Sequence, residues 1–409
     1  MQENTRQSDK FLWVQALVVM TFLQAVLAFL IRALPVIGPE ITVAAGAEPH
    51  DIGILAGAIS VGTMLFLMGG NLTITFYGPV RILQIGAIVC AIAVSLCFTA
   101  SWWFFVVAAF FIGVGYAPSL PAASDLLLRT SPPGRQSLIM SIKQAGVPLG
   151  GALAGVLLPA IVIFGGWQAA LLATAFLSIA GAVVVQPWRN MLDTDRNTTK
   201  RPTVGNVFAR TNLTMPFLVL KEIPGLLPLT LAVVCFSCAQ GCILTFFITQ
   251  LTTELRFSLA DAGIAYSAMQ VAGTFSRVVM GWLADKLGSG KTLLLLALIS
   301  TGMILALAQI SSDCPTWLVT LTGFALGITS ISWNGVYLAE VGRIAPKGRV
   351  GDATSGSSFF LFIAYSLGPF LFSFGVPLTG SYSLCFFAVA LVQLLAVPAL
   401  ARCIRLTPQ

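Results

Sequence analysis

Charge is scarce in this sequence. Only 9% of its 409 residues are Asp, Glu, Lys or Arg, whereas a soluble domain carries about a quarter. Histidine is nearly absent, since His50 is the only one. In contrast, 57% of the residues are hydrophobic and the mean hydropathy is +0.92. This balance excludes a soluble globular protein and indicates a chain that is surrounded by lipid.

Motifs for catalysis and for cofactor binding are missing as well. The sequence contains no glycine-rich phosphate loop of the ATP-binding type, no metal-ligand cluster and no Ser/His/Asp arrangement. We therefore expect neither an enzyme nor an ATP-driven pump, and no cofactor or metal. The net charge is +7, but no basic cluster with interleaved aromatic residues accompanies it, so we expect no nucleic-acid partner. Seven of the eight cysteines lie in apolar segments or at their ends, which argues against a disulfide framework.

Long apolar runs, separated by Gly, Pro or charged residues, make up most of the chain. Each crossing of a bilayer needs about 20 apolar residues, so the runs predict an all-α membrane protein with twelve transmembrane helices. The predicted spans lie near residues 12–36, 52–71, 80–99, 102–127, 138–163, 167–187, 227–250, 261–284, 291–310, 315–341, 353–375 and 380–402.

The basic residues are distributed unevenly about these spans. Eighteen of the 22 fall on one side, only Arg256 falls on the other, and Arg32, Lys143 and Arg277 fall inside spans. By the positive-inside rule, both termini and the even-numbered loops are cytoplasmic. We therefore expect a multi-pass protein of a bacterial inner membrane.

The two halves of the chain repeat each other. The polar stretch after the sixth span predicts a cytoplasmic linker over residues 188–226, between six-helix bundles at 1–187 and 227–409. Residues at the end of the fourth span recur 214 positions later, at the end of the tenth. The matching residues are Arg129, Pro132, Gly134 and Arg135 in the first copy, and Arg343, Pro346, Gly348 and Arg349 in the second. Such a repeat is typical of transporters whose halves are related by an axis along the membrane normal.

The loop after the eighth span carries a family motif. The run Gly281-Trp-Leu-Ala-Asp285-Lys286-Leu-Gly288 resembles the signature loop of the major facilitator superfamily. The resemblance implies two pseudo-symmetric six-helix bundles, which we expect to act as a monomer, and a gating role for Gly281, Asp285, Lys286 and Gly288. Glycines there permit close helix contact and a tight turn, and the carboxylate can engage a basic side chain or a helix N-terminus.

The equivalent loop after the second span is incomplete. It keeps Gly78 and Arg81, to which the resemblance also assigns gating roles, but Thr75 stands where the family has its acid. Acids remain at the ends of the fourth and tenth spans, where Asp125 precedes Arg129 by four residues and Glu340 precedes Arg343 by three. These spacings favour local ion pairs on a helix, so we interpret the four residues as gate or stability elements.

Further resemblance is to carriers of organic anions. Ile31-Arg32-Ala-Leu-Pro-Val is similar to the anion:cation symporter motif in which an Asp-Arg pair precedes small residues, and Gly113-Val-Gly-Tyr116-Ala-Pro-Ser-Leu-Pro-Ala is similar to that family's Gly-x-Gly-Glu motif. Arg277 resembles the eighth-span Arg with which monocarboxylate and oxalate carriers hold a carboxylate. The acids of these motifs are replaced here by Ile31, Tyr116 and Gly273.

Three bases inside the spans, with no clear acid at mid-membrane, form an unbalanced set that an anionic ligand would complete. We predict substrate binding by Arg277 and Arg32 first, and by Lys143 next. The alternatives are a structural Arg277 bonded to backbone carbonyls, and Arg32 or Lys143 side chains that reach the membrane surface. Neutral polar or aromatic side chains predicted to complete the site, or else to bond between helices, are Gln24, Gln240, Gln144, Gln270, Tyr116, Trp333 and Asn334.

The sequence thus predicts a secondary active transporter that moves a small mono- or dicarboxylate by alternating access. The sequence leaves three modes of transport open: coupling to a co-transported proton, exchange for a counter-anion, and uniport. One alternative is a drug or metabolite exporter of the proton-antiport type, because Gly146-Val-Pro-Leu-Gly150-Gly151 resembles the Gly-Pro-rich motif of drug/proton antiporters. The other alternative is a ligand sensor built on a carrier fold.

Overall fold

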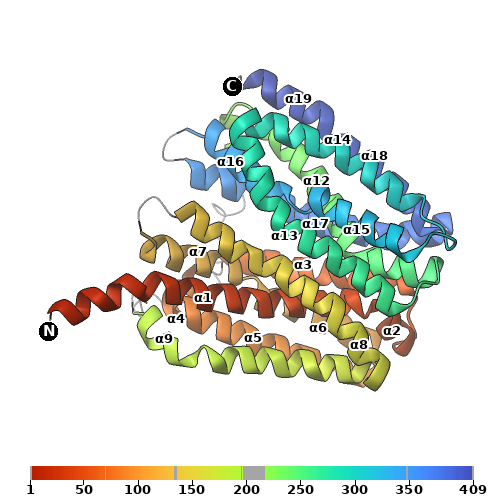
Figure 1. Ribbon diagram of the computed structural model, residues 1–409, viewed down its shortest axis with the longest axis horizontal. Coiled ribbons are helices and arrows are strands. Elements are labelled where there is room, and N and C mark those ends of the chain that lie inside the picture. Colours follow the sequence, from red (N-terminus) through yellow and green to blue (C-terminus); the bar gives the residue numbers. More distant parts are fainter. Residues whose placement is uncertain are drawn as a thin grey trace.

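The computed structural model describes residues 2–69, 71–132, 136–194, 196, 217–346 and 349–407. Within these ranges, some helical residues are described by their backbone alone, namely residues 2–11, 68, 69, 71, 72, 120, 125, 128, 136–138, 141 and 351. The described part consists of helices and connecting turns (Figure 1).

The helices form two groups in chain order. The first group comprises α1 (Gln2–Val36), α2 (Gly38–Ala44), α3 (Ile52–Gly69), α4 (Asn71–Tyr77), α5 (Pro79–Leu96), α6 (Trp102–Tyr116), α7 (Ser119–Thr130), α8 (Gln136–Val184) and α9 (Gln186–Leu192). The second group comprises α12 (Leu226–Thr249), α13 (Leu259–Leu287), α14 (Ser289–Ala308), α15 (Thr316–Ser330), α16 (Trp333–Ile344), α17 (Val350–Thr379), α18 (Tyr382–Leu394) and α19 (Ala396–Leu406). We call them the N-group and the C-group.

Twelve membrane crossings are present in the described residues. Ten helical segments are long and apolar enough to span a bilayer. One of them, Ile142–Val184, holds two crossings, since the backbone of α8 turns at Gly166 with a φ of 74°. The remaining crossing is α13, whose 29 residues include Arg277, Asp285 and Lys286 and are therefore less apolar. The predicted all-α fold with twelve transmembrane helices is confirmed.

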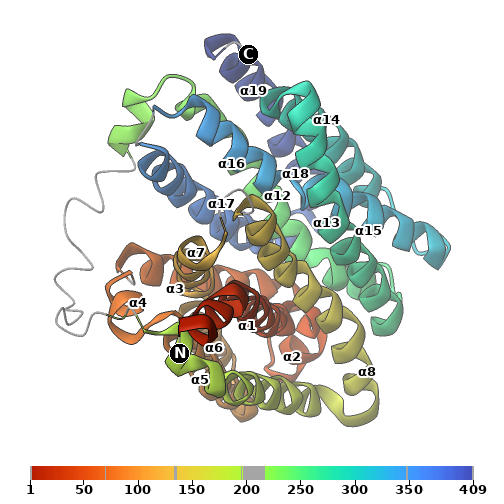
Figure 2. The same cartoon turned by 60° about the vertical axis from the view of Figure 1, so that its left-hand side comes forward.

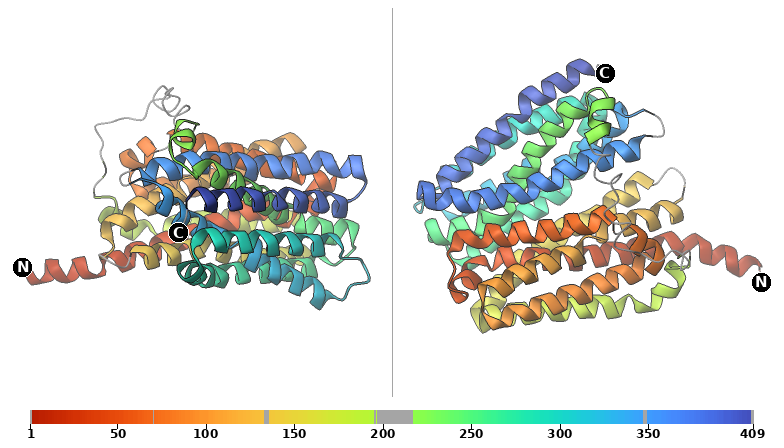
Figure 3. Two further views of the ribbon diagram at one scale, coloured as in Figure 1. Left: turned by 90° about the horizontal axis from the view of Figure 1, so that it is seen from above. Right: turned by 180° about the vertical axis from the view of Figure 1, so that it is seen from behind.

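The two groups meet at one end and diverge at the other. Both termini lie at the same end of the molecule, where the N-group and the C-group spread apart (Figures 1 and 3). We call this the terminal end and the opposite one the far end. The groups touch through α3 against α17 and α8 against α13, and a turned view shows α13 beside α8 (Figure 2).

Small residues allow these contacts between the groups. A Cβ atom at Gly53 of α3 would collide with the Pro369 carbonyl of α17, and one at Gly263 of α13 would collide with the Gly155 carbonyl of α8. Ser267 of α13 adds a hydrogen bond of 2.8 Å to a backbone carbonyl of α8. Glycine and serine at such crossings let helix backbones approach closely where lipid gives no hydrophobic driving force.

Part of the predicted linker cannot be compared with the structure, because residues 195 and 197–216 lie outside the described residues. The boundaries 1–187, 188–226 and 227–409 therefore stay predictions. A short helix, α9, runs over Gln186–Leu192 and so crosses the predicted boundary between 187 and 188.

Candidate functional site

Two arginines reach from one helix group to the other. Arg32 of α1 donates from Nη1 to the Tyr365 hydroxyl of α17 at 3.0 Å. Arg277 of α13 donates from Nη1 to the backbone carbonyl of Gln144 in α8, also at 3.0 Å. The Nε atom of each arginine is buried and has no hydrogen-bond partner in the described part of the chain. Both guanidinium groups therefore keep donors free for a ligand.

Phenol and amide groups surround the two arginines. Arg32 has Tyr365, Tyr266 and Tyr116 as electrostatic neighbours, and Tyr116 also neighbours Arg277. No ion pair joins either arginine to a carboxylate among the described residues. The site therefore offers positive charge and neutral polar groups, which suits an anion.

Two glutamines extend this polar lining. Gln24 Nε2 donates to the Tyr116 hydroxyl at 3.4 Å, and Gln270 Nε2 donates to the Tyr266 hydroxyl at 3.3 Å. The Oε1 atom of Gln24 is buried without a partner in the described structure. Such an acceptor is free to receive a hydrogen bond from a ligand hydroxyl.

Helix periodicity and small residues assemble the site. Tyr266, Gln270 and Arg277 stand at i, i+4 and i+11 of α13, so they share one face of that helix. Gly146 and Gly151 on α8 lie against Gln24 and Gln270 respectively, where larger side chains would collide. The glycines of α8 thus make room for polar side chains from both groups.

Lys143 has its hydrogen-bond partner within its own helix group. Its side chain is fully buried, and its ammonium group donates to the Ser119 carbonyl at 3.0 Å within the N-group. Its neighbour in the chain, Gln144, provides the carbonyl that accepts from Arg277. The structure therefore gives Lys143 a backbone partner, and its predicted contact with substrate stays a prediction.

The other predicted binding residues take different places. Trp333 is fully buried in the C-group, where its ring stacks on Phe236 at 5.5 Å. Gln240 is buried on α12, and Asn334 is half-buried on α16 beside Trp333. The half-buried Gln144 contributes its backbone carbonyl to Arg277. None of these four side chains forms a hydrogen bond with Arg32 or Arg277 in the described structure, so their role in binding also stays a prediction.

At the terminal end, the loop before α5 is closed by an acid from elsewhere in the chain. Gly78 has a φ of 92° and caps α5, and the carboxylate of Asp193 accepts hydrogen bonds from the backbone N–H groups of Val80 at 2.8 Å and Arg81 at 3.0 Å. Burial raises the pKa of Asp193, and these two hydrogen bonds oppose the rise. Asp193 thus supplies a carboxylate at the loop in which Thr75 replaces the family acid.

The corresponding loop before α14 carries the complete motif. Gly288 has a φ of 89°, so the predicted tight turn is confirmed. Open space surrounds Gly281 in this conformation, so the close helix contact that a glycine permits there stays a prediction. Asp285 is exposed and forms no ion pair with a described residue, while the Lys286 ammonium lies 3.9 Å from the ring centroid of Trp282. The carboxylate of this motif therefore has no charged partner in the described part of the chain.

The predicted ion pair at the end of the tenth span is present. Arg343 donates to both carboxylate oxygens of the fully buried Glu340 at 2.9 and 2.7 Å, and also to Thr407, the residue that follows α19. The pair therefore ties α16 to the C-terminal segment. The corresponding pair at the end of the fourth span, Asp125 with Arg129, lies outside the description, because the side chain of Asp125 is not among the described side chains. Arg129 is exposed and is not without a partner.

Three residues of these sites escaped the sequence analysis. Tyr266 and Tyr365 lie within spans, where a phenol is too ordinary to mark a site, although only six tyrosines occur in the chain. Asp193 lies 115 residues beyond Gly78, and no local pattern links the two. The arginines did carry a signal in the sequence, because a base is costly inside a membrane.

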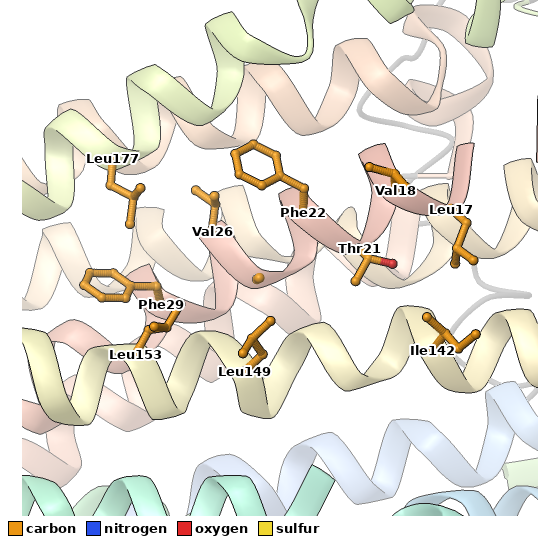
Figure 4. A pocket seen from close by; sticks show the side chains of 11 residues that line it. Leu17, Val18, Thr21, Phe22, Val26, Phe29, Ile142, Leu149, Leu153 and Leu177 are labelled. Carbon is orange, nitrogen blue, oxygen red and sulfur yellow. The ribbon is translucent and has the colours of Figure 1, made fainter. Parts of the chain in front are cut away.

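A separate apolar groove lies between α1 and α8 (Figure 4). Thr21 contributes the only hydroxyl among the eleven residues that line it, and the rest are apolar side chains such as Phe22, Phe29 and Leu149. Val18 and Leu149 are 61% and 50% exposed. A groove without charge on the outer face of the helices suits lipid chains, and it is not a site for an anion.

Comparison with known proteins identifies the family. The model of the Major Facilitator Superfamily matches residues 17–369 and, in a second match, residues 229–409. The chain belongs to the major facilitator superfamily. It is therefore a multi-pass membrane transporter, in agreement with the predicted fold and with the signature loop around Asp285.

Relatives across most of the chain include carriers of anions. The hexuronate transporter of Bacillus subtilis (strain 168) is 21% identical over 94% of this chain and 93% of its own length. The chloroplastic probable anion transporter 1 of Oryza sativa subsp. japonica is 22% identical over 71% of this chain and 58% of its own length. These identities are too low to transfer a substrate.

Solved structures share the fold. The peptide transporter POT in complex with sulfate superposes with a TM-score of 0.74 at 17% identity, covering 96% of this chain and 95% of that one. A bacterial homologue of the human lysosomal transporter Spinster, in an inward-facing and occupied conformation, superposes with a TM-score of 0.72 at 15% identity, covering 95% and 96%. At these identities the likeness concerns the fold alone.

Proposed function

We propose that this major facilitator transporter is a secondary active carrier of small organic anions, mono- or dicarboxylates, and works by alternating access. The observation that carries the proposal is the pair Arg32 and Arg277, one from each helix group, with free buried donors and no carboxylate partner in the described residues. Arg presents a planar fork that matches a carboxylate. An anion held by both groups would let their rocking carry it across the membrane.

The neutral groups beside the arginines favour a hydroxylated substrate. Tyr116, Tyr266 and Tyr365 offer phenol groups, and Gln24 offers a buried acceptor. The relative from Bacillus subtilis is named a hexuronate transporter, and a hexuronate bears both a carboxylate and several hydroxyl groups. We include sugar acids among the carboxylates for this reason.

The positive-inside distribution supports a bacterial inner membrane with both termini in the cytoplasm. In that orientation the terminal end, where the two groups diverge, faces the cytoplasm, and the contacts of α3 with α17 and of α8 with α13 lie toward the outside. We infer that the described conformation is inward-facing.

Uptake into proteoliposomes tests the proposal. Labelled pyruvate, succinate, glucuronate and galacturonate are offered to the wild-type protein and to Arg32→Gln and Arg277→Gln. Loss of a charge-assisted hydrogen bond costs about 1.5–3 kcal/mol, so each variant is expected to lower uptake of the transported anion by about 10- to 100-fold. Arg405→Gln, at an exposed position of α19, serves as the control that removes one positive charge elsewhere.

Undiminished anion uptake by both site variants would overturn the proposed site. Transport of amphipathic cations or neutral drugs with tolerance of Arg277→Gln would instead indicate an exporter. Saturable binding of an anion without any flux would indicate a sensor.

A further inference from the structure

The site holds positive charge that no carboxylate among the described residues neutralises. Arg32 and Arg277 are electrostatic neighbours of each other, and their hydrogen-bond acceptors are a phenol and a backbone carbonyl. The third intramembrane base, Lys143, likewise donates to a carbonyl. No described Asp or Glu forms an ion pair with any of the three. Within the described residues, the empty carrier therefore has an excess of buried positive charge.

This excess affects the loaded and the empty carrier differently. During alternating access the central site is closed from both sides, and the arginines lose contact with water. Removing unneutralised guanidinium groups from water carries a large penalty, whereas a carboxylate that pairs with both of them offsets it. The loaded carrier should thus change conformation faster than the empty one.

We propose that the protein is an anion exchanger, in which export of one organic anion is coupled to import of another because the empty carrier reorients slowly. The proposal rests on the proposed function and adds its coupling mode. A transporter that returned empty with ease would need an internal carboxylate or a readily neutralised base at the site, and the described residues around Arg32 and Arg277 provide no carboxylate.

Efflux from proteoliposomes tests exchange directly. Vesicles loaded with labelled glucuronate, succinate or pyruvate are diluted into buffer that contains the same unlabelled anion, or into buffer whose only anion is a bulky sulfonate. Potassium and valinomycin clamp the membrane potential at zero, and the pH is equal on both sides, so that neither charge build-up nor a proton gradient limits net efflux. We expect efflux to be at least about tenfold faster with anion outside.

A matched pair of variants tests the electrostatic cause. Tyr116 neighbours both arginines, so Tyr116→Glu places a carboxylate beside them, and Tyr116→Gln changes the side chain without the charge. We expect Tyr116→Glu to raise the ratio of net efflux to exchange several-fold, and Tyr116→Gln to leave this ratio near that of the wild type.

Each outcome decides between the claims. Equal efflux of the wild type with and without external anion would overturn exchange while leaving anion transport intact. Equal ratios in the two Tyr116 variants would overturn buried charge as its cause. No flux of any of the three anions in either condition would overturn the proposed function, and exchange with it.

Discussion

A charged side chain at the centre of a bilayer costs about 3 kcal/mol on insertion scales. The positions of Arg32 and Arg277 allow two alternatives to ligand binding, a side chain that reaches the membrane surface and a purely structural arginine. Arg32 does not extend to the membrane surface, since it donates to Tyr365 in the other helix group. Arg277 has a backbone carbonyl as its partner, as a structural arginine would, but its buried Nε atom is left free. Free donors in both residues are what favour a ligand.

Lys143 offers a contrasting case at the same scale. An ammonium group has three donors, and this one is fully buried with one carbonyl acceptor. We predict that Lys143→Met, whose unbranched side chain is one heavy atom shorter, raises the melting temperature in detergent by a few degrees. The substitution removes the cost, about 1–3 kcal/mol, of burying an ammonium group that has a single acceptor. The KM for the transported anion should change less than about threefold.

The control for this prediction is Lys143→Ala, which removes the charge but leaves a cavity and should gain less stability. A Lys143→Met protein that remains as stable as the wild type but transports no anion would show that the ammonium group acts on the substrate or on coupling.

At the scale of elements, capping of the first turn of α5 stabilises the loop at the terminal end of the molecule. The first turn of α5 leaves backbone N–H groups unpaired, and Asp193 accepts two of them across 113 residues of sequence. Gly78 is needed beside it, because its φ of 92° favours glycine and because a Cβ atom there would meet the Asp193 carboxylate. The loop and α9 are therefore held together by one acid and one glycine.

We predict that Asp193→Ala lowers the stability of the protein by about 1–2 kcal/mol, the usual effect of removing a helix cap. Asp193→Asn should lose less, since it keeps one oxygen acceptor and since burial already disfavours the charged carboxylate, as the raised pKa indicates. Thermal unfolding in detergent at constant scan rate measures both. Equal losses in the two variants would show that charge, and not hydrogen bonding, is what Asp193 contributes.

For the whole molecule, the sequence was sufficient to predict the architecture, because a membrane restricts the chain to helices of about 20 apolar residues. Twelve spans were expected and twelve are described. The differences lie where the membrane does not impose a pattern. Two predicted spans form one continuous element, α8, that turns at Gly166, and the short helices α2 and α4 lie in segments predicted as loops.

The candidate site was predictable in its charges and in part of its neutral partners, since Gln24, Gln270 and Tyr116 were expected and lie beside the arginines. Arg32 and Arg277 stood out because a base inside a span is rare, whereas Tyr266 and Tyr365 have no such cost and gave no signal. Trp333 and Gln240 had the right composition, but only the packing of the helices decides which side chains face the arginines. Pairings between distant segments, such as Asp193 with the start of α5, follow from tertiary structure alone.

The central claim is that Arg32 and Arg277 hold one anion between the two helix groups. The most direct measurement is a double-mutant cycle on the purified protein, in which calorimetry gives the affinity of the transported anion for the wild type, Arg32→Gln, Arg277→Gln and the double variant.

If both arginines contact the same carboxylate, each single variant should weaken binding by about 10- to 100-fold, and the double variant should lose at least about 1 kcal/mol less than the sum of the two. Strictly additive losses, or a single variant that binds as tightly as the wild type, would contradict a shared anion site.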